Sequence, residues 1–194
     1  MKKKKQLSVP TADQLETEIR RVRYNRRYRT VLKSTIYTLI TVAAVSVLVA
    51  TLWLPVLQIF GSSMTPTMQN GDIVFSLKTN AFQRGDVIAF YYNNKILVKR
   101  VIGCPGDWVD LDQDGVVYVN NEKLSEPYVT DMAYGDTNIE LPYQVPDGRL
   151  FVMGDHRSTS VDSRNTAVGC VAQEQIVGKI VVRIWPIDQF GLIE

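Results

Sequence analysis

Hydrophobic and polar positions divide the chain into three stretches of different pattern. Residues 1–33 are rich in Lys and Arg, and the segment TADQLETEIRRVRYNRRYRTVL has the composition of an exposed helix. No charged residue occurs from Ser34 to Gly71, and the run Ile36–Phe60 is mostly apolar. About 20 such residues are enough to cross the bilayer core as a helix. The pattern therefore predicts a basic segment at 1–33, a transmembrane helix at 34–60 and a separate domain at 61–194.

The third stretch carries short runs of Val, Ile, Phe and Tyr between turn-forming residues. The runs occupy residues 72–77, 85–92, 95–103, 115–124, 149–155 and 176–186. No long segment follows the 3.6-residue period of a helix, so these runs indicate strands. Within VYVNNEKL, the pair Asn120-Asn121 predicts a hairpin turn because Asn tolerates positive φ. The expected fold is mostly β, with several antiparallel sheets after a single N-terminal transmembrane helix.

Charge distribution gives this arrangement an orientation. Residues 1–33 hold eleven Lys or Arg against three acidic residues, a net +8, whereas residues 34–194 carry −6. Flanks rich in Lys and Arg stay in the cytoplasm, so residues 61–194 are expected to be extracytoplasmic. The apolar run is too long and begins too late for a cleaved signal peptide, which favours an uncleaved single-pass anchor. Two interpretations of the basic segment stay open: a helix lying along anionic headgroups, or a solvated helix. A bilayer partner is expected, and no nucleic acid.

Several sites are disfavoured by the residues present. The single His156 is too few for a hydrolytic zinc site, and a Ser-His-Asp triad would need it as the base. DLDQDG at 110–115 matches half of a calcium loop, but Asn121 replaces the glutamate at its twelfth position. RGD at 84–86 is interpreted as a turn before a strand. We expect no metal and no cofactor. The sequence does not decide whether Cys104 and Cys170 pair.

Among catalytic arrangements, a serine nucleophile activated by a neutral lysine remains compatible with the residues present. In KILVKRVIG, alternation places Lys99 and Arg100 on opposite faces of a strand, and both faces are apolar. The pattern alone does not choose between them. Arginine keeps its proton in proteins, whereas a desolvated lysine can lose it, so Lys99 is the candidate base. No Asp or Glu within this run opposes a lowered lysine pKa.

Four ordered motifs carry a family resemblance: GSSMTPTMQNGDIV, RGDVIAF, VKRVIGCPGD and MGDHRSTSVDSR. Together with the N-terminal anchor, they resemble the successive boxes of bacterial type I signal peptidases over about residues 36–186. The resemblance implies a membrane-anchored serine endopeptidase that removes signal peptides from exported preproteins with a Ser/Lys dyad. It assigns Ser63 as the nucleophile, Lys99 as the general base and Ser160 as the serine that orients the lysine. Asp162 and Arg164 fall on the pair that braces the site.

Two positions depart from the family pattern. Gly61 stands where many relatives carry a serine that donates to the oxyanion, whereas relatives of Gram-positive type share this glycine. The backbone N–H of Gly61 is therefore a candidate replacement. His156 stands where Asn is common and is interpreted as structural. The family binds its substrate as an added strand. Our candidates for the pocket walls are Ile59, Met64, Met68 and Val98. Preproteins are the expected partners, and the export translocon a further one.

Three other classes are weighed against this one. A sortase-like cysteine transpeptidase would use Cys170, His156 and Arg183, but no matching motif surrounds Cys170 and the His–Cys spacing is short. A self-cleaving repressor shares the dyad, but needs a DNA-binding domain where this chain has its apolar span. An inactive membrane-tethered binding module would keep the fold without needing Lys99.

Overall fold

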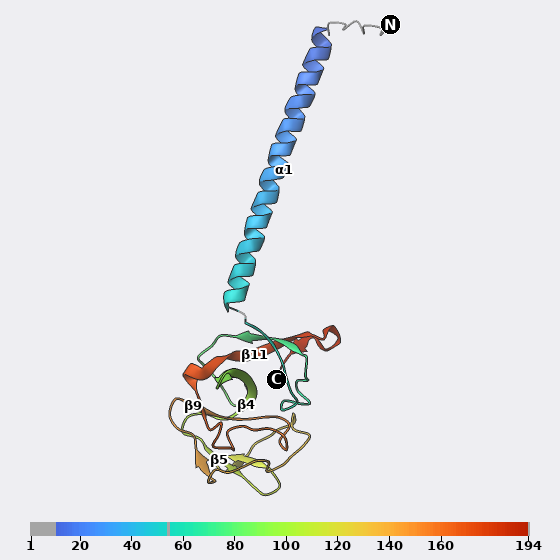
Figure 1. The fold of residues 1–194 in the computed structure, drawn as a ribbon. Coiled ribbons are helices and arrows are strands. Elements are labelled where there is room, and N and C mark those ends of the chain that lie inside the picture. The colour runs from blue at the N-terminus through green and yellow to red at the C-terminus, as the bar shows by residue number, and fades with distance from the viewer. Residues whose placement is uncertain (1–10, 54, 194) are drawn as a thin grey trace. The chain divides into compact units, whose positions relative to one another are not determined.

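The computed structural model describes residues 11–53 and 55–193, which form two compact units divided between Ala50 and Thr51. The described part of the first unit is formed by the helix α1 (Ala12–Trp53) up to Ala50, and this helix continues without a break from the basic segment into the apolar run (Figure 1). Its residues 12–50 are exposed throughout. By length and composition this is the one candidate membrane span among the described residues.

The helix ends earlier than the predicted boundary at residue 60. Pro55 lacks the backbone N–H that a continuing helix would use, and Val56–Gln58 form strand β1. Strand β1 pairs antiparallel with β2, with Leu57 opposite Val74. The last residues of the apolar run are therefore part of the second unit, which we call the β unit.

The β unit contains two antiparallel sheets (Figure 1). The larger has the order β1-β2-β11-β3-β4-β9-β10, with β12 added on β11, and the smaller has the order β7-β6-β5-β8. The elements after β1 are β2 (Ile73–Leu77), β3 (Val87–Tyr92), β4 (Lys95–Gly103), β5 (Trp108–Leu111), β6 (Val117–Val119), β7 (Glu122–Lys123), β8 (Tyr143–Gln144), β9 (Arg149–Met153), β10 (Val171–Ala172), η1 (Gln173–Gln175), β11 (Ile176–Trp185), η2 (Ile187–Gln189) and β12 (Gly191–Leu192).

The expected mostly β fold after an N-terminal apolar helix is confirmed, and each of the six predicted runs contains at least one strand. The hairpin at Asn120-Asn121 is also confirmed, since both residues have positive φ between β6 and β7. The strands that the sequence pattern missed have two to four residues, too few for a clear period of two.

Three buried clusters hold the β unit together. One joins the two sheets, with Ile102 of β4 and Phe151 of β9 packed against Val109 of β5 and Val119 of β6. A second lies beneath the segment 59–72 and contains Met64, Met68 and Val74. The third packs around Ile88, Phe90 and Val101. Strand β4 contributes to the packing on both of its faces, so its polar residues Lys99 and Arg100 are buried as well.

Candidate active site

Ser63 lies in the segment that connects β1 with β2. The residues around it turn tightly, because Thr65 N–H donates to Ser62 O (3.0 Å) and Met68 N–H donates to Met64 O (2.8 Å). Met64 and Met68 are buried and fix this turn on the core. Ser63 itself is only partly buried, so it remains partly accessible to solvent although apolar packing holds the turn around it.

The segment after β9 meets Ser63 through its backbone. His156 N–H donates to Ser63 O at 3.1 Å. Gly154 fits between Ser63 and Ser160 only because it has no side chain. A Cβ there would lie 2.5 Å from Ser63 O and 2.3 Å from Ser160 Oγ. The absence of a side chain at Gly154 thus allows Ser63 and Ser160 to lie close to the same part of the backbone.

Asp162 and Arg164 form a fully buried pair behind these serines. Arg164 Nε and Nη2 donate to the two oxygens of Asp162, both at 2.9 Å, and Gly154 N–H donates to Asp162 Oδ2 at 3.0 Å. Burial opposes ionisation of Asp162, but Arg164, Ser160 and the Gly154 N–H outweigh it and hold the pKa of this carboxyl below its usual value. Arg164 also donates to Arg157 O at 2.9 Å. The pair therefore fixes the loop that carries Ser160.

Ser160 has a buried hydroxyl that lies beside Asp162 and helps to lower the pKa of that carboxyl, but it makes no hydrogen bond of ordinary geometry within the described part of the chain. A hydroxyl has one donor and two acceptor sites, so its interaction with Asp162 leaves it able to accept a further hydrogen bond. Its surroundings are the Ser63 carbonyl and Gly154 on one side and Asp162 on the other.

Lys99 lies on β4 opposite Ile88 of β3 and is 3% exposed. Burial lowers the pKa of its amine to about 8, and Arg164 adds to this effect, whereas Asp162 and Asp155 oppose it. The sequence-based expectation that no carboxylate opposes the shift was therefore wrong, because residues distant in sequence lie nearby. Among the described residues Lys99 makes no ion pair within 4.0 Å. A buried amine without an ion pair is poised to lose its proton near neutral pH.

Arg100, the neighbour of Lys99, has a different environment. Its guanidinium donates to both oxygens of Asp155 at 2.9 and 2.8 Å and to Gly85 O at 2.8 Å, and it lies 3.8 Å from the centre of the Tyr128 ring. Arg100 is thus a paired structural cation beside the unpaired Lys99. The sequence pattern alone left these two positions equivalent.

A groove of about 630 Å³ runs along the exposed side of Ser63. It is bordered by residues 57–61 and 94–98 together with Ser63 and Met64. Three of the four predicted pocket residues, Ile59, Met64 and Val98, line it, as does Gly61. The fourth, Met68, is fully buried in the core and does not line the groove. The N–H of Gly61 donates to Asn70 Oδ1 at 3.0 Å, so this donor is already engaged.

The residues of the cysteine alternative do not come together. Cys104 and Cys170 are both free, and burial raises the pKa of the Cys170 thiol to about 11, which disfavours the thiolate. His156 instead bonds Thr159 through Nδ1, and its Nε2 lies 3.5 Å from Asp131. The arrangement offers Cys170 no base.

The acidic motif at residues 110–115 and the RGD at 84–86 are both held by hydrogen bonds or ion pairs within the β unit. Asp112 Oδ1 accepts hydrogen bonds from Asp114 N–H (3.0 Å) and Val116 N–H (2.9 Å), as in a turn. No group of three or more His, Cys, Asp or Glu suited to a metal ion occurs in residues 11–53 and 55–193. In the RGD stretch, Arg84 pairs with Asp107 and Asp86 pairs with Lys179, each at 2.6 Å.

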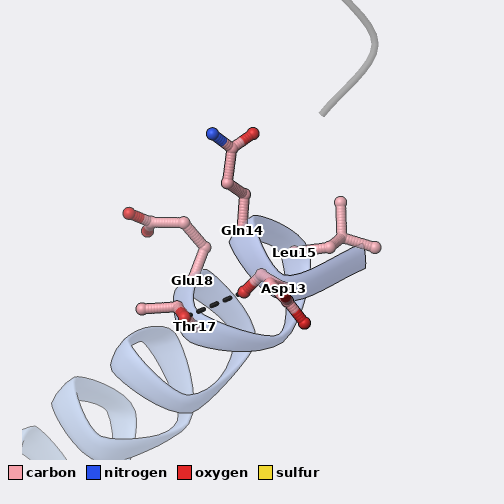
Figure 2. A pocket seen from close by; sticks show the side chains of 5 residues that line it. All are labelled: Asp13, Gln14, Leu15, Thr17 and Glu18. Atoms are coloured by element: carbon pink, nitrogen blue, oxygen red, sulfur yellow. Dashed lines mark hydrogen bonds between the residues drawn. The ribbon is translucent and has the colours of Figure 1, made fainter. Parts of the chain in front are cut away.

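The first turns of α1 carry a separate hollow, lined by Asp13, Gln14, Leu15, Thr17 and Glu18 (Figure 2). The side chains that line it belong to one helix and point outward, and the bond from Thr17 Oγ1 to Asp13 O (2.9 Å) lies within that helix. With no second element in its lining, this hollow has no opposing wall to hold a ligand.

Sequence reasoning missed several residues that hold this site. Thr67 Oγ1 donates to Asp155 Oδ2 at 2.5 Å, and the guanidinium of Arg183 lies 3.3 Å from Asp72. The Gly154 contact was also missed. A charged residue among the apolar positions of a strand, as at Arg183, indicates a buried partner, but the identity of that partner depends on the fold.

Comparison with known proteins gives a consistent result. A family model described as signal peptidase, peptidase S26, matches residues 32–185. A signal peptidase IB of Staphylococcus aureus (strain Mu50 / ATCC 700699) is 38% identical over 150 residues, which cover 67% of this chain and 77% of that one. A signal peptidase I of Bacillus caldolyticus is 39% identical over 147 residues, covering 68% and 79%. A solved structure of a signal peptidase I from Enterococcus faecalis V583 is 33% identical, with a TM-score of 0.44 over 51% of this chain and 96% of that one.

Proposed function

Since the chain belongs to the signal peptidase family, peptidase S26, we propose that Ser63 and Lys99 carry out its reaction. The family makes it an enzyme, a serine peptidase that removes signal peptides from preproteins. The observation that carries the residue assignment is Lys99, which is buried, makes no ion pair within the described residues and has a pKa lowered to about 8. Such an amine is a competent general base near neutral pH.

In the proposed mechanism, neutral Lys99 accepts the Ser63 proton while Ser63 Oγ attacks the scissile carbonyl. The protonated amine then donates to the departing amino group of the mature protein, which leaves an acyl-enzyme on Ser63. Lys99, neutral again, takes a proton from water, and the resulting attack releases the signal peptide and restores the serine. Ser160, whose buried hydroxyl lies beside Asp162, is proposed to bond the Lys99 amine and hold it toward Ser63.

The oxyanion formed in this reaction needs donors. The Gly61 N–H is engaged by Asn70, whereas no hydrogen bond occupies the Ser63 N–H within the described residues. We therefore assign the backbone N–H of Ser63 as an oxyanion donor, in place of the Gly61 N–H that the sequence suggested.

The groove suits an extended peptide. Strand β1 is the edge of the larger sheet, and β4 pairs with β9 only from Arg100 onward, so residues 95–98 keep a free edge. A signal peptide bound as a strand between these edges would make main-chain hydrogen bonds on both sides. Ile59, Met64 and Val98 would then contact its side chains and restrict the residue before the cut to small ones such as Ala.

The test is incubation of the full chain in detergent with a preprotein that carries an Ala-x-Ala site. We expect Ser63→Ala to abolish cleavage and Cys170→Ala to preserve it, and a substrate with Phe or Leu before the cut to be refused. Persistent cleavage by Ser63→Ala would remove the serine mechanism. Equal cleavage of the Ala and Leu substrates would remove the pocket assignment.

Membrane placement is a further part of the proposal. The uncharged residues 34–53 of α1 span about 30 Å at 1.5 Å per residue, close to the thickness of the hydrocarbon core. We propose one crossing, with the basic end in the cytoplasm and the β unit outside, where translocon-delivered preproteins arrive. Protease added to intact spheroplasts should reach loops of the β unit and leave residues 1–30 uncut. The reverse pattern would overturn this orientation.

A further inference from the structure

Arg183 on β11 contacts residues 59–72, the segment that carries Ser63, which we call the nucleophile segment. Its Nη2 donates to Thr67 O, and its Nε lies 3.3 Å from Asp72 Oδ2. Thr67 and Arg183 are 116 residues apart in sequence, and the Arg183 and Asp72 side chains are only 13% and 5% exposed. This contact therefore joins the last long strand of the sheet to the segment that carries Ser63.

Asp72 closes the base of the same segment. Its Oδ2 accepts the Gln69 N–H at 3.0 Å, its backbone O accepts the Ile59 N–H at 2.8 Å, and its N–H donates to Gln69 O at 3.2 Å. Arg183 thus donates a hydrogen bond to the middle of the segment, at Thr67 O, and forms an ion pair with Asp72, the residue whose backbone O ties the two ends of the segment. Nη1 of Arg183 bonds Gln189, which fixes the guanidinium from its third side.

The nucleophile segment is also held by residues that follow β9. Ser63 O accepts from His156 N–H at 3.1 Å, and Thr67 Oγ1 donates to Asp155. Ser63 therefore lies in a turn that is fixed at both ends, and Arg183 is the one side chain from β11 in the described structure that bonds it. A small rotation of this turn would move Ser63 Oγ relative to Lys99, and misplacement by about 1 Å can cost about 100-fold in rate.

We propose that Arg183 is a positioning residue for Ser63, acting through Thr67 O and Asp72 without touching the substrate. The role rests on the proposed nucleophile. Lysine cannot replace it, because one ammonium cannot reproduce the planar fork that reaches a carbonyl and a carboxylate together.

The experiment measures kcat and KM of the full chain in detergent on a preprotein substrate, across a pH series. Arg183→Lys and Arg183→Gln are expected to lower kcat 10- to 100-fold, to leave KM within twofold and to keep the pH midpoint of the wild type, because Lys99 is unchanged. Lys179→Gln is the matched control. Lys179 also lies on β11 and pairs with a carboxylate, Asp86, but has no bond to the nucleophile segment, so its kcat should stay within twofold.

Arg183→Lys keeps the charge, so it provides the test if Arg183→Gln does not fold. Near-ultraviolet circular dichroism checks the folding of each variant. Adding Asp72→Asn to Arg183→Gln should lower kcat by less than the product of the single losses, because both act on one segment. Wild-type kcat in folded Arg183→Lys would overturn the proposal, as would an equal loss in Lys179→Gln. Cleavage by Ser63→Ala would instead show that the proposed nucleophile had failed.

Discussion

Along α1, Arg23, Arg26 and Arg29 are exposed and make no ion pair among the described residues, whereas in the β unit Arg100, Arg157 and Arg164 are fully buried and each is paired with a carboxylate. The difference follows from solvation. Water satisfies an exposed guanidinium, but removing one from water costs several kcal/mol unless a carboxylate and carbonyls replace the solvent. The helix therefore presents charge to its surroundings, and the β unit uses charge to fix loops.

Lys99 belongs to neither group. It is buried like the three paired arginines, yet it has no ion pair among the described residues, and its pKa is lowered to about 8. Where an arginine requires a partner, a lysine can give up its proton. The comparison thus separates three uses of a basic residue: external charge, internal brace and base.

The largest effect is expected at Lys99. Lys99→Arg keeps a cation that cannot be deprotonated, so kcat/KM should fall by about 10²- to 10⁴-fold, the usual contribution of a general base. In the wild type, the fraction of neutral amine grows as pH rises, so kcat/KM should increase with pH through a midpoint of about 8. The measurement is a pH–rate profile on one preprotein, with Lys179→Arg as the control. Near-normal turnover of Lys99→Arg would end the Ser/Lys assignment.

The paired arginines should matter for stability. Arg164→Gln leaves Asp162 buried without its cation, so the free energy of unfolding should fall by about 3–5 kcal/mol. Arg21→Gln removes one partner of an exposed pair with Glu18 and should change it by less than about 0.5 kcal/mol. Urea unfolding in detergent, followed by the fluorescence of Trp108 and Trp185 in the β unit, compares the two. Similar small losses in both variants would show that burial does not separate these arginines.

The sequence predicted the architecture because the relevant signals are local. The uncharged run, the six β-rich runs and the Asn120-Asn121 turn each depend on neighbouring residues, and the structure has the corresponding elements. The end of α1 was misplaced because apolar composition alone does not distinguish the last membrane residues from a buried edge strand such as Val56–Gln58.

The candidate site was predictable only in part. Ordered motifs led to the proposed site residues Ser63, Lys99, Ser160, Asp162 and Arg164, but the contacts that hold them join residues far apart in the chain. Gly154 against Ser63 O, Arg183 against Thr67 O and the carboxylates that oppose the Lys99 shift all depend on how the strands pair. The order of residues along the chain does not give the distances between such residues in the fold. The displacement of Met68 from groove wall to core has the same origin.

A smaller effect concerns the cost of burying Lys99. The amine has a pKa of about 8 in the folded chain and about 10.4 when unfolded, so between these values the unfolded state binds more protons. The free energy of unfolding should therefore rise with pH from about 8 to about 10.4. Below about 8, the full free-energy cost of burying the charged amine is present. Lys99→Met removes this penalty and should be more stable than the wild type at pH 7 by up to roughly 3 kcal/mol.

The measurement is the difference in unfolding free energy between Lys99→Met and wild type at pH 7 and at pH 10.5, which cancels other titrating groups. The difference should shrink toward zero at the higher pH. A difference that is independent of pH would mean that the folded chain does not depress the Lys99 pKa.

The smallest effect is expected from the exposed cations of α1. The seven basic residues from Arg20 to Lys33 are distributed around the helix at 100° per residue, so they form a collar and no single basic face. A helix lying flat on headgroups needs one polar and one apolar face, so the collar favours a helix that continues straight out of the bilayer. Anionic headgroups would then surround it, each cation contributing about 1 kcal/mol or less.

This prediction can be measured with spin-labelled lipids in vesicles that contain the full chain. The wild type should associate with phosphatidylglycerol more strongly than with phosphatidylcholine, and added salt should reduce the preference. Arg26→Gln/Arg29→Gln should lower it severalfold, while Arg20→Gln/Arg21→Gln should lower it less, because Glu16 and Glu18 already neutralise those two arginines. Both double variants remove the same charge. Equal losses would therefore show that net charge alone selects the lipid, and that the lack of an ion pair at Arg26 and Arg29 has no effect.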